Sequence, residues 1–452
     1  MLFNSLYFLV FLALVLTVYH GLLRSFAARK LFLLAASWAF YATWSPRFLL
    51  LLIATTWIDF QLARIIYRAR AVSPARARAL LVASLGLNLG LLAFFKYGLF
   101  LYDSADALFR LRPAPGFLAV VVPLGISFYT FHSISYVIDT YRGIRPPTES
   151  FSDFALYVAF FPQLIAGPIT RWGFFGPQLA ERPHVGMTRI EASLFLLAVG
   201  YVKKVACADS LGGFVDGVYA DIGDHGWIEL AVALYAYAFQ IYFDFSGYTD
   251  IAMGVAGLLG FRLPENFRHP YLAENPSEFW RRWHISLSTW LRDYLYVPLG
   301  GNRRRPAFNL IVTMTLGGLW HGAGWTFVLW GFLHGVLLWL ERELPKVPRG
   351  VGVLVTFHVV ALLWVPFRAP DLAALRVFFA RLFAPPYVWA TRVDTQYVVV
   401  AVLFLALQGP WFRAFPLERR EPARWELAAA AAMFLWLLGA GVGRVDFIYF
   451  VF

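Results

Sequence analysis

Long apolar runs, separated by short stretches of charged or turn-forming residues, follow one another along the whole chain. The hydrocarbon core of a bilayer is about 30 Å thick, and roughly 20 apolar residues cross it as a helix. By this rule the pattern predicts about a dozen helices, of which the shorter ones are tilted or re-entrant. The predicted helices lie at residues 2–23, 31–44, 48–67, 79–102, 117–137, 154–169, 192–211, 230–259, 311–340, 351–365, 397–407 and 427–442. The sequence therefore predicts an all-α, polytopic integral membrane protein.

The composition supports this class. Of the 452 residues, 60% are hydrophobic and only 15% are charged, and the mean hydropathy is +0.62. An ordinary soluble domain has about 25% charged residues, so this chain has too few charges to cover a water-facing surface of its size. The 18% of aromatic residues also excludes an intrinsically disordered chain. Cys207 is the single cysteine, so neither an intramolecular disulfide nor a thiol-rich metal site is expected.

Basic residues between the first helices indicate the orientation of the chain. Arg24, Arg29 and Lys30 follow the first predicted helix, and further arginines follow the third between positions 64 and 78. Cytoplasmic loops of membrane proteins carry an excess of lysine and arginine, so both loops are expected in the cytoplasm and the N-terminus outside. The opening run has neither a basic n-region nor a small-residue cleavage site, which predicts a retained helix and not a signal peptide.

Residues 275–284 combine basic and aromatic side chains. Asn275 or Ser277 can cap a helix here, and in one continuous helix Trp280, Arg281 and His284 share a face. Arginine binds phosphate with two hydrogen bonds and tryptophan suits the membrane interface, so the segment is expected to face anionic phosphates. The alternative is an amphipathic helix that binds only lipid head groups.

His321 lies inside an apolar run and is bracketed by glycines at positions 317, 318, 322 and 324. A histidine at membrane depth is expected to face a cavity or a partner group and not lipid. The glycines allow either close helix packing or a helix break, which leaves room for a substrate beside the imidazole. Because histidine titrates near neutral pH, His321 is a candidate general base. The alternative is a structural histidine that hydrogen-bonds a neighbouring helix, and His334 fits that alternative better.

Two further segments place polar groups inside apolar runs. Asp244, Ser246 and Asp250 lie in the predicted helix 230–259, where an aspartate costs about 2.5–3.5 kcal/mol at mid-bilayer. They form either a polar wall of a reaction cavity or hydrogen bonds that fix the helix bundle. Residues 161–169, which include Gln163, interrupt their run with two prolines and a glycine, so this backbone lines a cavity or is buried in protein. Phosphate-loop, nucleophile-elbow and zinc-helix signatures are absent, so nucleotide hydrolysis is not expected.

Taken together and in this order, four motifs resemble the membrane-bound O-acyltransferase family. The resemblance is closest to its bacterial branch of alginate O-acetyltransferases and teichoic acid D-alanyl transfer proteins. The motifs are FFPQLIAGPI (160–169), YFDFSGYTD (242–250), NPSEFWRRWHISLSTWLRDYLYVPLGG (275–301) and LGGLWHGAGWTFVLWGFLHG (316–335), with the tail FIYFVF (447–452). The resemblance implies one membrane domain over residues 1–452, a helical bundle with a central tunnel. N-terminal helices (1–150) and C-terminal helices (346–452) would flank a catalytic core (151–345).

The resemblance also implies the site and its substrates. The invariant family histidine corresponds to His321 and the second motif histidine to His284, and both are expected to be catalytic. Further side chains are expected to bind donor or acceptor: Trp280, Arg281, Arg282, Asn302, Asp244, Ser246, Trp320 and Gln163. The arginines at 281, 282 and 303–305 would hold donor phosphates or anchor the cytoplasmic face. No metal and no permanently bound cofactor are expected.

The implied reaction is acetyl transfer from a cytoplasmic thioester, acetyl-CoA, to a hydroxyl outside the bacterial inner membrane. The acceptor is an exopolysaccharide such as alginate or a periplasmic acyltransferase partner of SGNH type. Membrane lipid is the other expected contact, and no nucleic acid is expected. Two alternatives stay open: D-alanyl transfer from a carrier-protein thioester to teichoic acid, and transport of a lipid-linked saccharide. His321 would act either as general base or as a transiently acylated group.

Overall fold

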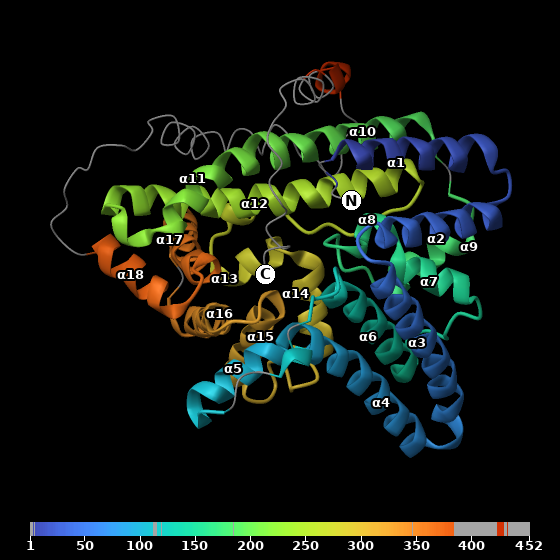
Figure 1. Cartoon of the computed structure of the whole chain (residues 1–452), viewed down its shortest axis with the longest axis horizontal. Coiled ribbons are helices and arrows are strands. Elements are labelled where there is room, and N and C mark those ends of the chain that lie inside the picture. The colour runs from blue at the N-terminus through green and yellow to red at the C-terminus, as the bar shows by residue number, and fades with distance from the viewer. Residues whose placement is uncertain are drawn as a thin grey trace. The chain divides into compact units, whose positions relative to one another are not determined.

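The computed structural model describes residues 3, 5–111, 115–118, 120–183, 185–345, 347–383, 423–428 and 432, and all secondary structure in these residues is helical. In the described part of the chain, four apolar helical segments are long enough to cross a membrane: Pro46–Val72, Pro74–Phe109, Trp227–Leu258 and Arg349–Arg368. The all-α membrane prediction is thereby confirmed (Figure 1). The chain forms two compact units, and the predicted division at residues 150 and 345 stays a prediction. Unit 1 comprises Met1–Leu194 with Ile251–Pro264, and unit 2 comprises Phe195–Asp250 with Glu265–Phe452.

Unit 1 begins with helices that start at serine caps. Ser5, Ser25, Ser45, Ser73 and Ser150 each accept a hydrogen bond from a backbone N–H of the first turn that follows. The helices are α1 (Leu6–Leu16, continued by a π-helix to Leu22), α2 (Phe26–Ala42), α3 (Pro46–Val72), α4 (Pro74–Leu92), α5 (Gly98–Phe109), α6 (Ile126–Arg142), α7 (Phe151–Ala159), α8 (Phe161–Leu164) and α9 (Trp172–Ala180). Helix α3 packs against α4, α6 and α7, which fixes the centre of this unit.

The interrupted run at residues 161–169 is buried in unit 1. Gln163 Nε2 donates to the carbonyl of Tyr157 at 2.7 Å, and the Tyr157 hydroxyl donates to the carbonyl of Thr170 at 2.9 Å. The backbone N–H of Thr170 donates to His132 Nε2 at 3.2 Å. Side chains of unit 1 therefore satisfy backbone groups on both sides of this broken run, and Gln163 lies among protein groups of that unit.

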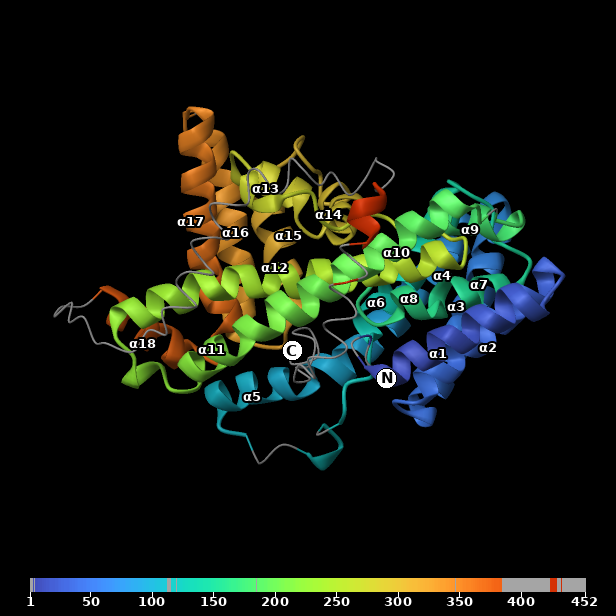
Figure 2. The same cartoon turned by 90° about the horizontal axis from the view of Figure 1, so that it is seen from above.

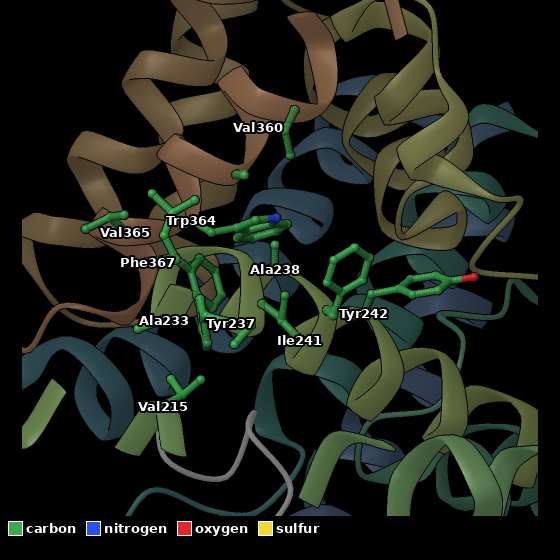
Figure 3. Packing of buried hydrophobic residues seen from close by; sticks show 14 of the residues in the cluster. Val215, Ala233, Tyr237, Ala238, Ile241, Tyr242, Val360, Trp364, Val365 and Phe367 are labelled. Carbon is green, nitrogen blue, oxygen red and sulfur yellow. The ribbon is translucent and has the colours of Figure 1, made fainter. Parts of the chain in front are cut away.

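Unit 2 is built around an aromatic core. Its helices are α11 (Asp209–Ala220), α13 (Pro276–Arg282), α14 (Ile285–Leu291), α15 (Pro306–His321), α16 (Trp325–Glu343), α17 (Arg349–Arg368) and α18 (Leu372–Phe383), with parts of α10 (Met187–Tyr201) and α12 (Trp227–Leu258). Figure 3 shows Val215 of α11, Tyr237 and Ile241 of α12, and Trp364 and Phe367 of α17 packing together. Burial of these large side chains is the main stabilising contribution here.

The helix predicted at 311–340 is wrong, because this run forms two helices. Helix α15 ends at His321 and α16 begins at Trp325, and the two lie side by side (Figure 2). The glycine-rich turn at 322–324 reverses the chain. A Cβ at Gly318 would clash with the carbonyl of Phe327, and a Cβ at Gly331 with that of Met314. The glycines therefore provide both the helix break and the close packing that the sequence left open.

Other boundaries also differ from the sequence pattern. The predicted helix 79–102 is α4 and α5 joined by a π-helix at Ala93–Tyr97, and the helix predicted at 117–137 begins only at Ile126. Helices α9, α13, α14 and α18 are shorter than a spanning segment, and the length rule did not detect them. The predicted helix 397–407, most of 427–442 and the tail motif lie outside the described residues.

Candidate active site

His321 is the last residue of α15 and is buried among aromatic rings. Its ring centroid lies 5.0 Å from that of Trp320, 5.3 Å from Trp330 and 5.3 Å from Phe367. Trp330 comes from α16 and Phe367 from α17, so three helices form the surroundings of this imidazole. These rings fix the orientation of His321 and exclude bulk water from it.

His284 lies beside His321, with 6.1 Å between the two ring centroids. Its ring also meets the Phe245 ring edge to face, at 4.6 Å. Residue 284 connects two seven-residue helices, α13 and α14, outside the helices long enough to span the membrane. Burial lowers the pKa of His284 to about 3, so its ring is neutral at physiological pH. Among the described residues, neither ring nitrogen of His284 has a hydrogen-bond partner.

The prediction that Trp280, Arg281 and His284 share one helix face is wrong. Of the two caps that the sequence left open, Asn275 and not Ser277 caps α13. The helix ends at Arg282, and His284 has a left-handed backbone with φ of 42°. Two backbone hydrogen bonds with the non-helical segment around Asn266 and Arg268 flank this kink. Arg268 donates to the carbonyl of Arg282 at 2.9 Å and Ile285 donates to that of Asn266 at 3.0 Å. The kink turns His284 into the aromatic cluster.

Trp280 and Trp320 both join this cluster. Trp320 is adjacent to His321 in sequence, and its ring also lies 6.0 Å from that of His284. Trp280 Nε1 donates to Nδ1 of the buried His334 at 3.4 Å, and its ring lies 5.7 Å from that of Trp330. His334 therefore has a polar neighbour that was not evident from its sequence context.

The remaining arginine and amide candidates occupy a more polar setting. Arg282 pairs with Glu278 one turn earlier, while Arg281 is exposed. Asn302 is exposed, and its Oδ1 accepts hydrogen bonds from the Tyr296 hydroxyl at 2.7 Å and from Arg342 at 3.0 Å. The arginines at 303–305 are exposed on the same turn. These contacts do not join Asn302 to either histidine.

Asp244 and Asp250 are both held in buried ion pairs. Lys204 Nζ lies 2.7 Å from carboxylate oxygens of both Asp244 and Asp209, and Lys203 Nζ lies 2.6 Å from Asp250. These pairs support the alternative in which the aspartates fix the helix bundle.

Ser246 and Gln163 differ in their surroundings. Ser246 Oγ is buried and has no hydrogen-bond partner among the described residues. Gln163 belongs to unit 1, where it bonds the Tyr157 carbonyl.

Sequence reasoning missed several residues of this region. Lys203 and Lys204 lie in the apolar run 192–211, and two charges there were a signal that the aspartates of another run have partners. Phe245, Asn266 and Phe367 gave no such signal, because one more aromatic or amide residue is not unusual in this chain. No group of three His, Cys, Asp or Glu side chains in the described part of the chain is placed to hold a metal ion.

Comparisons with known proteins identify the family of this chain. The family model of the membrane-bound O-acyltransferase family matches residues 143–349, which contain both histidines. The chain is 42% identical to the probable alginate O-acetylase AlgI of Azotobacter vinelandii over 85% of this chain and 78% of that protein. It is 38% identical to the peptidoglycan O-acetyltransferase of Helicobacter pylori (77% and 72%) and 29% identical to the teichoic acid D-alanyltransferase of Streptococcus thermophilus (54% and 68%). The chain therefore belongs to the membrane-bound O-acyltransferase family, as an O-acyltransferase of the membrane.

Proposed function

We propose that this protein transfers an acetyl group from acetyl-CoA in the cytoplasm to a hydroxyl group of an exopolysaccharide such as alginate. A periplasmic acyltransferase of SGNH type can be the immediate acceptor, which then passes the acetyl group to the polymer. The observation that carries the proposal is the pair of buried imidazoles, His284 and His321, with ring centroids 6.1 Å apart in an aromatic cluster. Relatives named as alginate and peptidoglycan acetyltransferases support acetyl as the group and a glycan as the acceptor.

In the proposed reaction, His321 acts as the general base. A ring nitrogen takes the proton of the acceptor hydroxyl as its oxygen attacks the thioester carbonyl. The tetrahedral intermediate then collapses, the C–S bond breaks, and the thiolate takes the proton from the imidazolium. His284 hydrogen-bonds the reacting groups through its ring nitrogens, which have no hydrogen-bond partner among the described residues. In the second version of this route, a neutral nitrogen of His321 attacks the thioester carbonyl, the C–S bond breaks, and the CoA thiolate leaves with the imidazole proton. The acceptor hydroxyl then attacks the acyl-imidazole and passes its proton to the imidazole as the N–C bond breaks.

The two versions differ in one observable intermediate. Without acceptor, a transiently acylated His321 retains radiolabel from [acetyl-14C]acetyl-CoA on the denatured protein, and hydroxylamine releases it. A general base gives no such label. If His321 is acylated, His321→Ala removes the label. If His321 is a general base, neither the wild-type nor the His321→Ala protein is labelled.

The proposed topology follows the basic residues. Inner-membrane insertion with the N-terminus outside puts the loops at 24–30 and 64–78 in the cytoplasm, in agreement with the excess of arginine there. The exposed arginines at 303–305 would meet the phosphates of acetyl-CoA on the same side, and a tunnel through the bundle would lead the thioester to the histidines. Labelling of single cysteines introduced at positions 24 and 303 of a Cys207→Ser protein tests this, since both should react only in permeabilised cells.

The central test is His321→Ala in the purified protein reconstituted into liposomes. Loss of a positioned base lowers the rate by about 10²–10⁴-fold, with the melting temperature little changed. His358→Ala is the matched control, because His358 is an exposed histidine whose ring, among the described residues, hydrogen-bonds the Leu354 carbonyl of its own helix α17. Wild-type acetylation by the His321→Ala protein would refute the proposal.

The D-alanyl alternative differs in donor and in acceptor. A teichoic acid D-alanyltransferase is among the relatives, with lower identity and coverage of this chain. In that reaction the exposed arginines would meet an acidic carrier protein. Supplying the reconstituted protein with either acetyl-CoA or a D-alanyl carrier thioester decides between the two. The family assignment makes the chain an enzyme, so it does not support the transporter alternative.

A further inference from the structure

His284 occupies an unusual position at the start of a helix. It is the N-cap residue of α14, and its side chain makes no capping hydrogen bond. At this position Ser, Thr, Asp or Asn is preferred, because the side chain accepts a hydrogen bond from the second or third backbone N–H of the helix. His284 leaves that N–H unsatisfied by its own side chain, and its backbone is left-handed. Another group must therefore satisfy the start of α14 and hold the kink.

Asn266 supplies the missing cap from a different segment of unit 2. Its Oδ1 accepts hydrogen bonds from the backbone N–H of Ser286 at 3.2 Å and from the Ser286 hydroxyl at 2.6 Å. Ser286 is the second residue of α14, where an N-cap side chain normally binds. The Asn266 carbonyl also accepts from the N–H of Ile285 at 3.0 Å. Asn266 is buried, so these bonds are protected from competition by water.

The same asparagine is also tied to the helix that faces the His284 ring. Asn266 Nδ2 donates to Thr249 Oγ1 of α12 at 3.4 Å. Four residues earlier on α12, Phe245 meets the ring of His284 edge to face. One side chain thus connects the backbone next to His284 with the helix that contacts its ring.

We propose that Asn266 is a positioning residue for acyl transfer, which caps α14 in place of His284 and so keeps both ring nitrogens of His284 available to substrate. The proposal rests on the proposed function, in which His284 contacts the reacting groups. Asn266 acts only through His284 and does not touch substrate. Without this cap, the first N–H groups of α14 would be unsatisfied. They would then hydrogen-bond a ring nitrogen of His284, or the kink at residue 284 would relax.

A double-mutant cycle tests this directly. Asn266→Ala should lower kcat by at least tenfold while the KM for acetyl-CoA stays within twofold of wild type. Asn266→Asp keeps an acceptor oxygen for Ser286 and should restore most of the rate. In a His284→Ala background, Asn266→Ala should change kcat by less than twofold, because the residue through which it acts is gone. Equal losses in both backgrounds, or a wild-type rate for Asn266→Ala, would overturn the proposal.

Two controls separate positioning from general stability. Asn88→Ala removes another buried, hydrogen-bonded asparagine, in unit 1, and should leave kcat per folded molecule unchanged. If Asn266→Ala does not fold, Ser286→Ala removes the 2.6 Å bond from the hydroxyl and keeps the backbone bond to Asn266. It should lower kcat severalfold in the otherwise wild-type protein and have no further effect in the His284→Ala background. An unchanged rate for Ser286→Ala then overturns the proposal. If His321→Ala abolishes transfer but the Asn266 cycle is additive, the positioning role fails while the proposed function stands.

Discussion

Unit 2 contains two buried polar centres that the protein treats in opposite ways. In the lysine–aspartate cluster, formed by Lys203, Lys204, Asp209, Asp244 and Asp250, each charge has an opposite charge at 2.6 or 2.7 Å. In the histidine centre, formed by His284 and His321, the neighbours are aromatic, and the His284 nitrogens have no hydrogen-bond partner in the described part of the chain. One centre is charged and paired, and in the other the neutral ring of His284 is open to a further partner.

The difference follows from the cost of burying charge. An isolated ion in a low-dielectric interior is strongly destabilising, so buried carboxylates and ammonium groups need each other. A neutral imidazole carries a smaller penalty and can await a substrate. Helix α12 serves both centres, since Asp244 pairs with Lys204 and the next residue, Phe245, contacts His284. We infer that the lysine–aspartate cluster fixes α12 and that the histidine centre performs chemistry.

The largest effect is expected from Lys204→Met. It leaves Asp209 and Asp244 buried without their cation, which costs about 3–5 kcal/mol of unfolding free energy. The melting temperature in detergent should fall sharply, while kcat per folded molecule stays near wild type. The matched control, Lys204→Met with Asp209→Asn and Asp244→Asn, removes the charges together and should regain most of the stability. A stable Lys204→Met protein that has lost transfer would break the comparison by placing the cluster in the chemistry.

Low pH should destabilise the protein through the histidine centre by less than Lys204→Met does through the lysine–aspartate cluster. The pKa of His284 is lowered by burial to about 3, below the usual value of about 6.5. Its contribution to stability is therefore complete above about pH 6.5 and is lost as the pH falls toward 3, by about 2 kcal/mol at pH 5. His284→Phe lacks this titration, so between pH 7.5 and pH 5 it should lose less stability than wild type in thermal unfolding. Equal losses would mean that His284 already has a charge-stabilising partner.

Long apolar elements could be predicted from the sequence, and their junctions could not. The run 230–259 became α12 (Trp227–Leu258), because one apolar stretch of that length has few other ways to satisfy its backbone in a membrane. The hairpin at 322–324 was ambiguous, since glycines permit a break and close packing equally. The chain break at His284 depends on Asn266, which is 18 positions earlier and has no periodic signal.

The candidate site shows the same limit. His321 was distinctive because a histidine among glycines in an apolar run is rare, and the resemblance added His284. Their proximity, and the aromatic rings around them, come from the packing of α12, α15, α16 and α17 with the junction of α13 and α14, which no local pattern encodes. The aspartates were visible as charges at membrane depth, but their roles depend on Lys203 and Lys204, and pairing partners are set by tertiary structure.

A third, exposed group of charges extends the comparison. The arginines at 303–305 are solvent-accessible, so replacing all three with glutamine should leave the melting temperature unchanged, because surface charges contribute about 0–1 kcal/mol. If they hold donor phosphates, the KM for acetyl-CoA should rise about three- to tenfold with kcat unchanged, and salt should raise the wild-type KM in the same direction. Arg110→Gln, which removes an exposed arginine in unit 1, is the control. An unchanged KM would leave these arginines only a role in anchoring.

Ser246→Ala has the smallest expected effect. Ser246 lies on α12, which provides Asp244 to the lysine–aspartate cluster and Phe245 to the histidine centre. Its hydroxyl is buried and, in the described part of the chain, has no hydrogen-bond partner. A structural hydroxyl would be bonded, and removing an unbonded one costs the folded state nothing. Ser246→Ala should therefore leave the melting temperature unchanged or slightly higher, and should raise the KM for donor or acceptor about two- to fivefold if substrate is the missing partner. Thr313→Ala, which removes another buried hydroxyl of unit 2, is the control. Wild-type kinetics for Ser246→Ala would confine the chemistry of unit 2 to the histidine centre.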